Sequence, residues 1–133
     1  MSVENTRKVM EHYFAAEHDD VSDLADDVVF TIMGTGQEHA GPQAVLDMLH
    51  YFYRQAFNAR AETTNIIIGD GRCCLEAMFR GEHTGEFAGV PATGREVNVP
   101  LCVVYDLEDD KIKRGRVYFE TPIFLAEVGA LPD

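Results

Sequence analysis

A carboxylate near the C-terminus is the group in this sequence best suited to acid/base chemistry. Residues 111–121 are rich in β-branched and aromatic types, which favour a strand. Side chains alternate along a strand, so Glu120 shares one face with Tyr118 and Arg116. A carboxylate in apolar surroundings is costly unless it has a partner. Glu120 is therefore either neutralised by Arg116 in a structural ion pair, or a catalytic acid or base in a pocket.

A second carboxylate and a second arginine lie on the predicted strand 72–83. Glu76, Met78 and Arg80 stand at alternate positions, so they share one face of this strand. On a concave face, Glu76 and Arg80 would join Arg116 and Glu120 in one buried network. On a convex face, they would form a charged row in solvent. The sequence leaves both arrangements open.

Two tyrosines and two histidines are further candidates for substrate binding. Tyr13 and Tyr118 can donate hydrogen bonds into a pocket, although core packing is the usual role of such residues. His39 precedes a predicted helix and can approach a pocket rim. His83 adjoins a Gly-rich loop, where it can polarise a carbonyl; we favour a role in ordering the loop.

The remaining histidines give no indication of a metal site. His12, His18 and His50 lie on predicted helices without the spacing of metal ligands. The Gly-rich loop lacks the strand-to-helix context and the lysine of a phosphate-binding loop. We therefore predict neither a metal nor a nucleotide cofactor.

The apolar spacing predicts the elements that hold these side chains. Helical spacing is found in three early segments, namely 3–17, a short helix in 19–27, and 41–56. Strands are expected over 28–33, 61–68, 72–83, 96–107 and 111–121, followed by a terminal helix that begins at Pro122. Helices segregated against a mostly antiparallel sheet predict an α+β fold.

Length and composition restrict the function further. A chain of 133 residues fits a single domain, 1–133. The formal net charge of −12 argues against a nucleic acid or an anionic membrane surface as partner. No signal peptide and no apolar run long enough to span a bilayer is recognised. Three cysteines without metal or disulfide spacing favour a reduced, cytoplasmic setting.

The stretch 81–95 carries a recognisable motif. Its members are Gly81, His83, Gly85, Phe87, Gly89, Pro91, Thr93, Gly94 and Arg95. With Tyr118, Glu120 and the tail Val128, Gly129, Ala130 and Leu131, the chain resembles the SnoaL-like polyketide cyclase family of the nuclear transport factor 2-like superfamily. The resemblance implies a cone in which three N-terminal helices pack on a curled, mostly antiparallel sheet, with a short C-terminal helix.

The resemblance also implies a function. Glu120 stands where the family has its catalytic aspartate, and the family's cyclases abstract a proton next to a carbonyl and close a ring without metal or cofactor. A raised carboxylate pKa would allow this near neutral pH. The implied partner is a small hydrophobic or aromatic molecule, and family habit implies a homodimer through the outer sheet face.

Several residues of related enzymes are missing. The cyclases' asparagine on the first strand and histidine on the penultimate strand are absent, as are the carboxylates of steroid isomerases, whose helix-borne tyrosine is matched by Tyr13. The Arg-x-Asp of epoxide hydrolases is missing too. We therefore expect a more apolar pocket. The alternatives to a cyclase or isomerase are a non-catalytic binding or accessory protein of this fold, and a purely structural dimer module.

Overall fold

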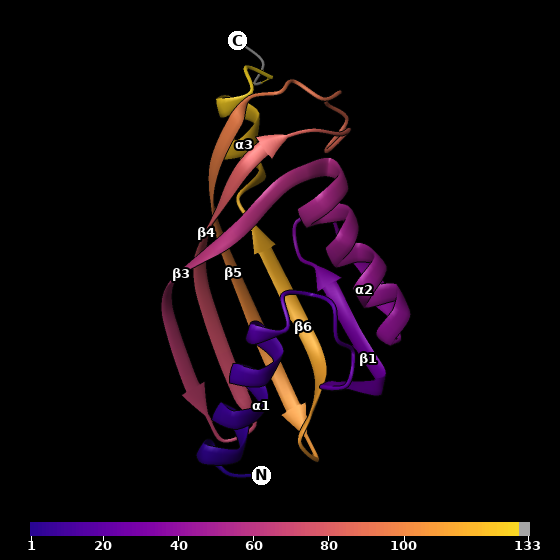
Figure 1. Cartoon of the computed structure of the whole chain (residues 1–133), viewed down its shortest axis with the longest axis vertical. Coiled ribbons are helices and arrows are strands. Elements are labelled where there is room, and N and C mark those ends of the chain that lie inside the picture. The colour runs from indigo at the N-terminus through magenta and orange to yellow at the C-terminus, as the bar shows by residue number, and fades with distance from the viewer. Residues whose placement is uncertain (131–133) are drawn as a thin grey trace.

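A single curled sheet forms the body of the molecule, as shown by a computed structural model that describes residues 1–130 (Figure 1). Its six strands lie in the order β2-β1-β6-β5-β4-β3, and only β1 and β6 pair in parallel. The strands are β1 (Leu24–Ile32), β2 (Gln37–Ala40), β3 (Phe57–Gly69), β4 (Arg72–His83), β5 (Glu96–Glu108) and β6 (Lys111–Phe119). The nuclear transport factor 2-like α+β cone expected from the sequence is confirmed.

The helices cover the inner face of the sheet. They are α1 (Val3–Ala15), α2 (Pro42–His50), the π-helical turn η1 (Tyr51–Ala56) and α3 (Thr121–Glu127). Ser2 caps α1 by accepting a 3.0 Å hydrogen bond from the Asn5 backbone N–H. Pro42 stands in the first turn of α2, where its missing N–H costs nothing. Figure 1 shows α1 across one end of the sheet and α2 along β1.

Alternation along the strands separates an apolar face from a mixed one. On β5 the buried side chains are Val97, Val99, Leu101, Val103, Tyr105 and Leu107. Leu75, Ala77 and Phe79 extend this inner face across β4. Phe52 from η1 packs on it, with its ring centroid 4.7 Å from that of Phe79. The inner face is therefore the hydrophobic core.

Three elements differ from the sequence prediction. The short helix expected within 19–27 is wrong, because Leu24 already belongs to β1 and pairs with Ile112 of β6. Burial of Leu24 and Ala25 against the core outweighs their local helical preference. The short polar strand β2 was not predicted, and β3 begins at Phe57 rather than at residue 61. Leu131, part of the family-like tail, lies outside the described residues.

Gly81 occupies a point where β3 and β4 approach closely. A Cβ added at Gly81 would lie 2.2 Å from the Asn58 carbonyl oxygen and 2.5 Å from the Ala59 Cα. We expect Gly81→Ala to lower the free energy of unfolding by about 1–3 kcal/mol, because backbone must shift to make room. Urea unfolding followed by circular dichroism measures the change.

The matched control for this substitution is Gly34→Ala. Nothing lies within 4 Å of a Cβ at Gly34, and its φ is not in the left-handed region. The urea midpoint of Gly34→Ala should stay close to that of the native protein. Equal midpoints for the two variants would contradict the close approach of the strands.

Candidate functional site

The larger of two interior cavities lies between α2, η1, β6 and the loop 84–95. We call it the aromatic cavity; its volume is about 810 Å³. Its apolar wall includes Phe52, Phe87 and Phe119, and the polar side chains in its lining are Thr35, Gln37, His39, Asp47, Tyr51 and Thr121. It has no lysine or arginine in its lining. Such a cavity suits a ring-containing ligand that carries no negative charge.

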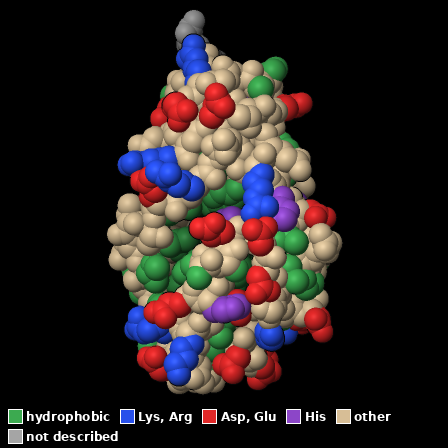
Figure 2. All heavy atoms as spheres, in the orientation of Figure 1, with side chains coloured by type: hydrophobic (Ala, Val, Ile, Leu, Met, Phe, Trp, Pro, Cys, Tyr) green, Lys and Arg blue, Asp and Glu red, His purple; other side chains and the backbone are tan. Residues whose placement is uncertain are grey.

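The second cavity lies between α1, η1 and the inner face of the sheet. We call it the tyrosine cavity, because Tyr13, Tyr53 and Tyr105 line it; its volume is about 540 Å³. Figure 2 shows a hollow with an apolar floor on this side of the molecule, flanked by charged side chains. The two cavities share four lining residues, Ile32, Met48, Phe52 and Val117. The interior of the cone is thus two-lobed, with these side chains between the lobes.

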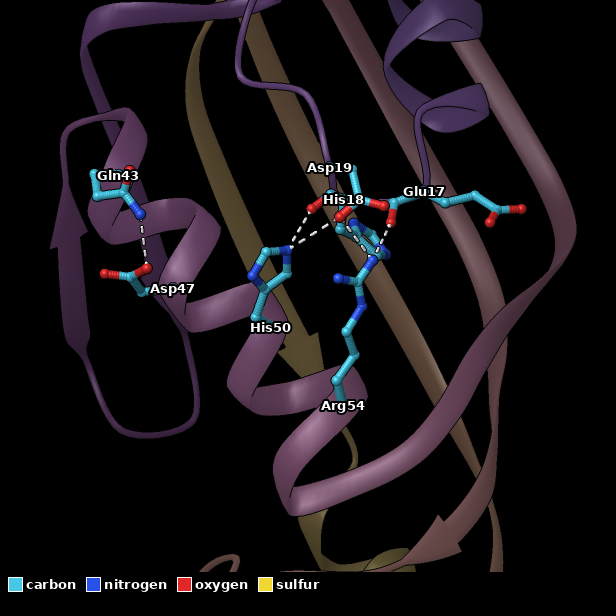
Figure 3. Close-up of polar contacts among 7 residues, drawn as sticks. All are labelled: Glu17, His18, Asp19, Gln43, Asp47, His50 and Arg54. Carbon is cyan, nitrogen blue, oxygen red and sulfur yellow. Dashed lines mark hydrogen bonds and ion pairs between the residues drawn. The ribbon is translucent and has the colours of Figure 1, made fainter.

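His39 and Asp47 bring titratable groups to the aromatic cavity. His39 is half-buried on β2, and Asp47 is exposed on α2. The Gln43 amide donates a 2.8 Å hydrogen bond to one oxygen of Asp47 (Figure 3). Tyr51, one turn further along, donates its hydroxyl to the Glu86 carbonyl and so ties the helix to the loop 84–95. Of these residues, only His39 was predicted from the sequence. The i, i+4 spacing of Asp47 and Tyr51 places both on one face of the helix and could have indicated the other two.

A cluster at the rim of the tyrosine cavity joins the segment after α1 to α2 and η1 (Figure 3). Arg54 forms a 2.9 Å ion pair with Asp19, and the His50 ring nitrogen Nε2 lies 2.7 Å from the His18 carbonyl oxygen. The His18 ring stacks on Tyr53 at 4.2 Å. Burial, together with the nearby Arg54 charge, lowers the pKa of His18 to about 4. His18 is therefore a neutral wall of the cavity near neutral pH.

The Glu120 side chain lies in neither cavity. It is exposed and occupies the N-cap position of α3, while its neighbours Phe119 and Thr121 both line the aromatic cavity. Of the two alternatives for Glu120, the structural ion pair with Arg116 is not formed, because Arg116 pairs with Asp106 at 2.6 Å. A hydrogen bond and the charge of Asp106 raise the pKa of Arg116. The acid/base role of Glu120 remains a prediction.

Glu76, Arg80 and Tyr118 lie on the outer face of the sheet. Glu76 accepts a 3.0 Å hydrogen bond from the Asn65 amide, and Arg80 forms a 2.9 Å ion pair with Glu62. None of the three lines either interior cavity. The concave network of Glu76, Arg80, Arg116 and Glu120 is therefore wrong, because alternation on β4 turns the apolar side chains inward.

His83 is completely buried behind the loop 84–95. Its Nδ1 lies 2.9 Å from the Thr93 hydroxyl and accepts a 3.3 Å hydrogen bond from the Thr93 backbone N–H. Its ring centroid lies 5.3 Å from that of Phe57 and 5.0 Å from that of Phe124. His83 lines neither cavity, and its contacts hold the loop that supplies Phe87 to the aromatic cavity.

Two features are absent from the part of the chain that the structure describes. Within residues 1–130, no group of three or more His, Cys, Asp or Glu side chains could hold a metal ion. Across the same residues, no helix combines the length and the apolar character needed to cross a membrane.

The sequence profile of the SnoaL-like polyketide cyclase family matches residues 6–122. Among curated proteins, no sequence matches significantly. Among solved structures, a protein from Jannaschia sp. CCS1 assigned as a SnoaL-like polyketide cyclase is 16% identical, with a TM-score of 0.84. The match covers 97% of this chain and 94% of that one.

Two further structures have the same fold. IdmH from Streptomyces antibioticus, assigned as a polyketide cyclase, is 21% identical, with a TM-score of 0.75 and coverage of 93% of this chain and 98% of its own. A protein from Kribbella flavida DSM 17836 assigned as a ketosteroid isomerase is 13% identical, with a TM-score of 0.66 and coverage of 87% and 78%. At these identities the similarity establishes the fold.

The low pKa of His18 makes stability depend on pH. The unfolded chain protonates this residue near its ordinary pKa of 6.5, whereas the folded chain does so only at about 4. The unfolded state therefore binds more protons between these values, and stability falls with decreasing pH. We expect a loss of about 1–3 kcal/mol from pH 7 to pH 4 that His18→Gln removes, measured by urea unfolding across this range.

His12 should have the opposite effect to His18 on how stability depends on pH. A hydrogen bond to Asp23 raises the pKa of His12, so this residue stabilises the fold below its unfolded pKa and less as pH rises. In His12→Gln, the free energy of unfolding should fall more steeply between pH 7 and pH 4 than in the native protein. A His18→Gln variant with an unchanged acid slope would contradict the buried, neutral state of His18.

Proposed function

Because the chain belongs to the SnoaL-like polyketide cyclase family, we propose that it is a cofactor-free cyclase- or isomerase-type enzyme acting on a hydrophobic carbonyl compound. The observation that carries this proposal is the aromatic cavity of about 810 Å³, with Phe52, Phe87 and Phe119 in its wall. Its volume lies in the range that buries a small organic ligand, and its aromatic rings suit a planar one.

Glu120 is the proposed acid or base. Its position between Phe119 and Thr121, which both line the cavity, supports a reach to the cavity mouth once a ligand is bound. Catalytic groups are often poorly aligned in ligand-free structures, so the exposed carboxylate remains a candidate. His39 and Asp47 already line the cavity and are the candidates if Glu120 does not take part.

Proton exchange tests this assignment directly. Aromatic polyketides and steroid ketones are incubated with the protein in D₂O, and NMR follows loss of the proton next to the carbonyl. We expect Glu120→Gln to slow this exchange at least about 100-fold, because the general base is lost. Glu108→Gln, at another exposed glutamate, is the matched control and should exchange at the native rate.

His39→Gln and Asp47→Asn complete this series. An unchanged rate in Glu120→Gln together with a large loss in either of these variants would move the base into the aromatic cavity and refute the role of Glu120. Equal native-like rates in all three variants would refute a carboxylate or imidazole base from this set.

A second candidate function is non-catalytic binding. The observation that favours it is the exposed Glu120 side chain, which lies outside both cavities. Such a protein would bind the same hydrophobic compound in the same cavity and would carry or protect it. Tight binding without proton exchange in the native protein would favour this function over the enzyme.

A homodimer through the outer sheet face is part of the proposal. The apolar side chains of that face are Ile67, Cys74, Met78, Pro100, Cys102, Val104 and Tyr118, and Ile67 and Tyr118 are 59% and 41% exposed. A partly exposed apolar surface supports association. The free cysteines Cys73, Cys74 and Cys102 support a reducing compartment such as the cytoplasm.

Light scattering tests the proposed dimer. We expect the native protein to be a dimer at micromolar concentration and Tyr118→Glu to be a monomer, because a charge would be buried in the interface. Ile123→Glu is the matched control, since Ile123 is 40% exposed but lies on α3. A native monomer, or equal dissociation of the two variants, would contradict this interface.

A further inference from the structure

The tyrosine cavity holds three phenol groups from three separate elements. Tyr13 comes from α1, Tyr53 from η1 and Tyr105 from β5, and all three line the cavity. Their side chains are nearly buried, with exposed fractions of 4%, 9% and 4%. The rings of Tyr13 and Tyr105 lie 5.8 Å apart between centroids. The fold therefore gathers three polar groups inside an otherwise mostly apolar part of the cone.

The hydroxyls of these tyrosines have no protein partner within residues 1–130. Tyr51, by contrast, donates its hydroxyl to the Glu86 carbonyl. In the same part of the chain, the sole fully enclosed side-chain nitrogen or oxygen without a partner is His83 Nε2. The unpartnered hydroxyls of Tyr13, Tyr53 and Tyr105 are thus not sealed by protein, and they keep surface in contact with the cavity they line.

The three hydroxyls are available to a guest, because no protein group takes their hydrogen bonds. Since they keep surface in the cavity, water can satisfy them until a ligand replaces it. Burial raises the pKa of all three phenols, so they are neutral at physiological pH and each can both donate and accept. A guest that brings one or two oxygen atoms would satisfy them.

We propose that the tyrosine cavity is a recognition site for the hydroxyl or carbonyl oxygen of a ring-containing ligand, held by the hydroxyls of Tyr13, Tyr53 and Tyr105. This inference rests on the proposed binding of a hydrophobic compound in the cone, but not on catalysis. The two cavities share Phe52, Met48, Ile32 and Val117, so the tyrosine cavity directly adjoins the aromatic cavity.

The surroundings of the tyrosine cavity favour a flat guest. Phe14 and Phe30 flank Tyr105, with ring centroids 5.9 and 6.1 Å from it. The two arginines in the lining are both paired: Arg54 with Asp19 at 2.9 Å, and Arg60 with Glu62 at 2.9 Å. No unpaired arginine lines the cavity, so an oxygen of a neutral phenol or ketone fits better than a carboxylate or phosphate.

A pair of ligands that differ in one oxygen tests the proposal. The probes are 2-naphthol and naphthalene, whose fluorescence is readily followed because the chain contains no tryptophan. We expect the native protein to bind 2-naphthol about tenfold more tightly, the effect of one or two well-formed hydrogen bonds. In the triple variant Tyr13→Phe, Tyr53→Phe, Tyr105→Phe, 2-naphthol should lose this advantage while naphthalene binds as before.

A control variant locates the effect. Tyr118→Phe changes a tyrosine of the outer face, which lines neither cavity. It should keep the tenfold preference. A preference that survives in the triple variant, that is absent from the native protein, or that disappears in Tyr118→Phe would overturn the proposal.

Stability of the triple variant gives an independent readout. Because the three hydroxyls have no protein partner, their removal should leave the urea midpoint unchanged or raise it. A lowered midpoint would show that the hydroxyls serve the fold and would count against the proposal. Failure of proton exchange with an intact 2-naphthol preference would refute the enzyme and leave this site standing, so the two proposals fail separately.

Discussion

The alternation of side chains along β4, β5 and β6 is the constraint on which the site depends. It turns an unbroken apolar surface toward the helices and sends Glu76, Arg80 and Arg116 outward. Nearly every polar group inside the cone must therefore come from a helix, a strand end or an edge strand. His39, Asp47, Tyr51 and the tyrosines of α1 and η1 meet this requirement, and Tyr105 is the exception that the central strand provides.

The π-helical turn η1 supplies side chains to both lobes of the interior. It buries Phe52 and Tyr53 at consecutive positions, so Phe52 stands between the cavities while Tyr53 faces the tyrosine cavity. A π-helical turn is frequently found at functional sites because it re-aims side chains that a regular helix would point elsewhere. On β6, the absence of a side chain at Gly115 leaves room for the Phe30 ring, since a Cβ there would lie 2.7 Å from a ring carbon. Together these features open the cone without leaving its core unpacked.

The fold could be predicted from the sequence to a large extent, because long periodic segments and the motif from Gly81 to Arg95 point to one architecture. The site could be predicted only in part. Tyr13 and His39, two of the candidates from the sequence, line the interior, whereas the arrangement of Glu76 and Arg80 depended on which face of β4 is concave. That choice is made by packing across several strands, which a single strand's pattern does not reveal. Asp47 is exposed on α2 and lines the aromatic cavity, and a helical pattern alone does not distinguish a carboxylate beside a cavity from one in open solvent.

Binding of a ring-containing carbonyl compound inside the cone is tested most directly by a crystal structure of the protein with an aromatic polyketide bound. We expect ligand density among Phe52, Phe87 and Phe119, with an enolisable carbon within about 3.5 Å of a carboxylate or imidazole. Density confined to the outer face of the sheet, with both cavities unoccupied, would contradict it.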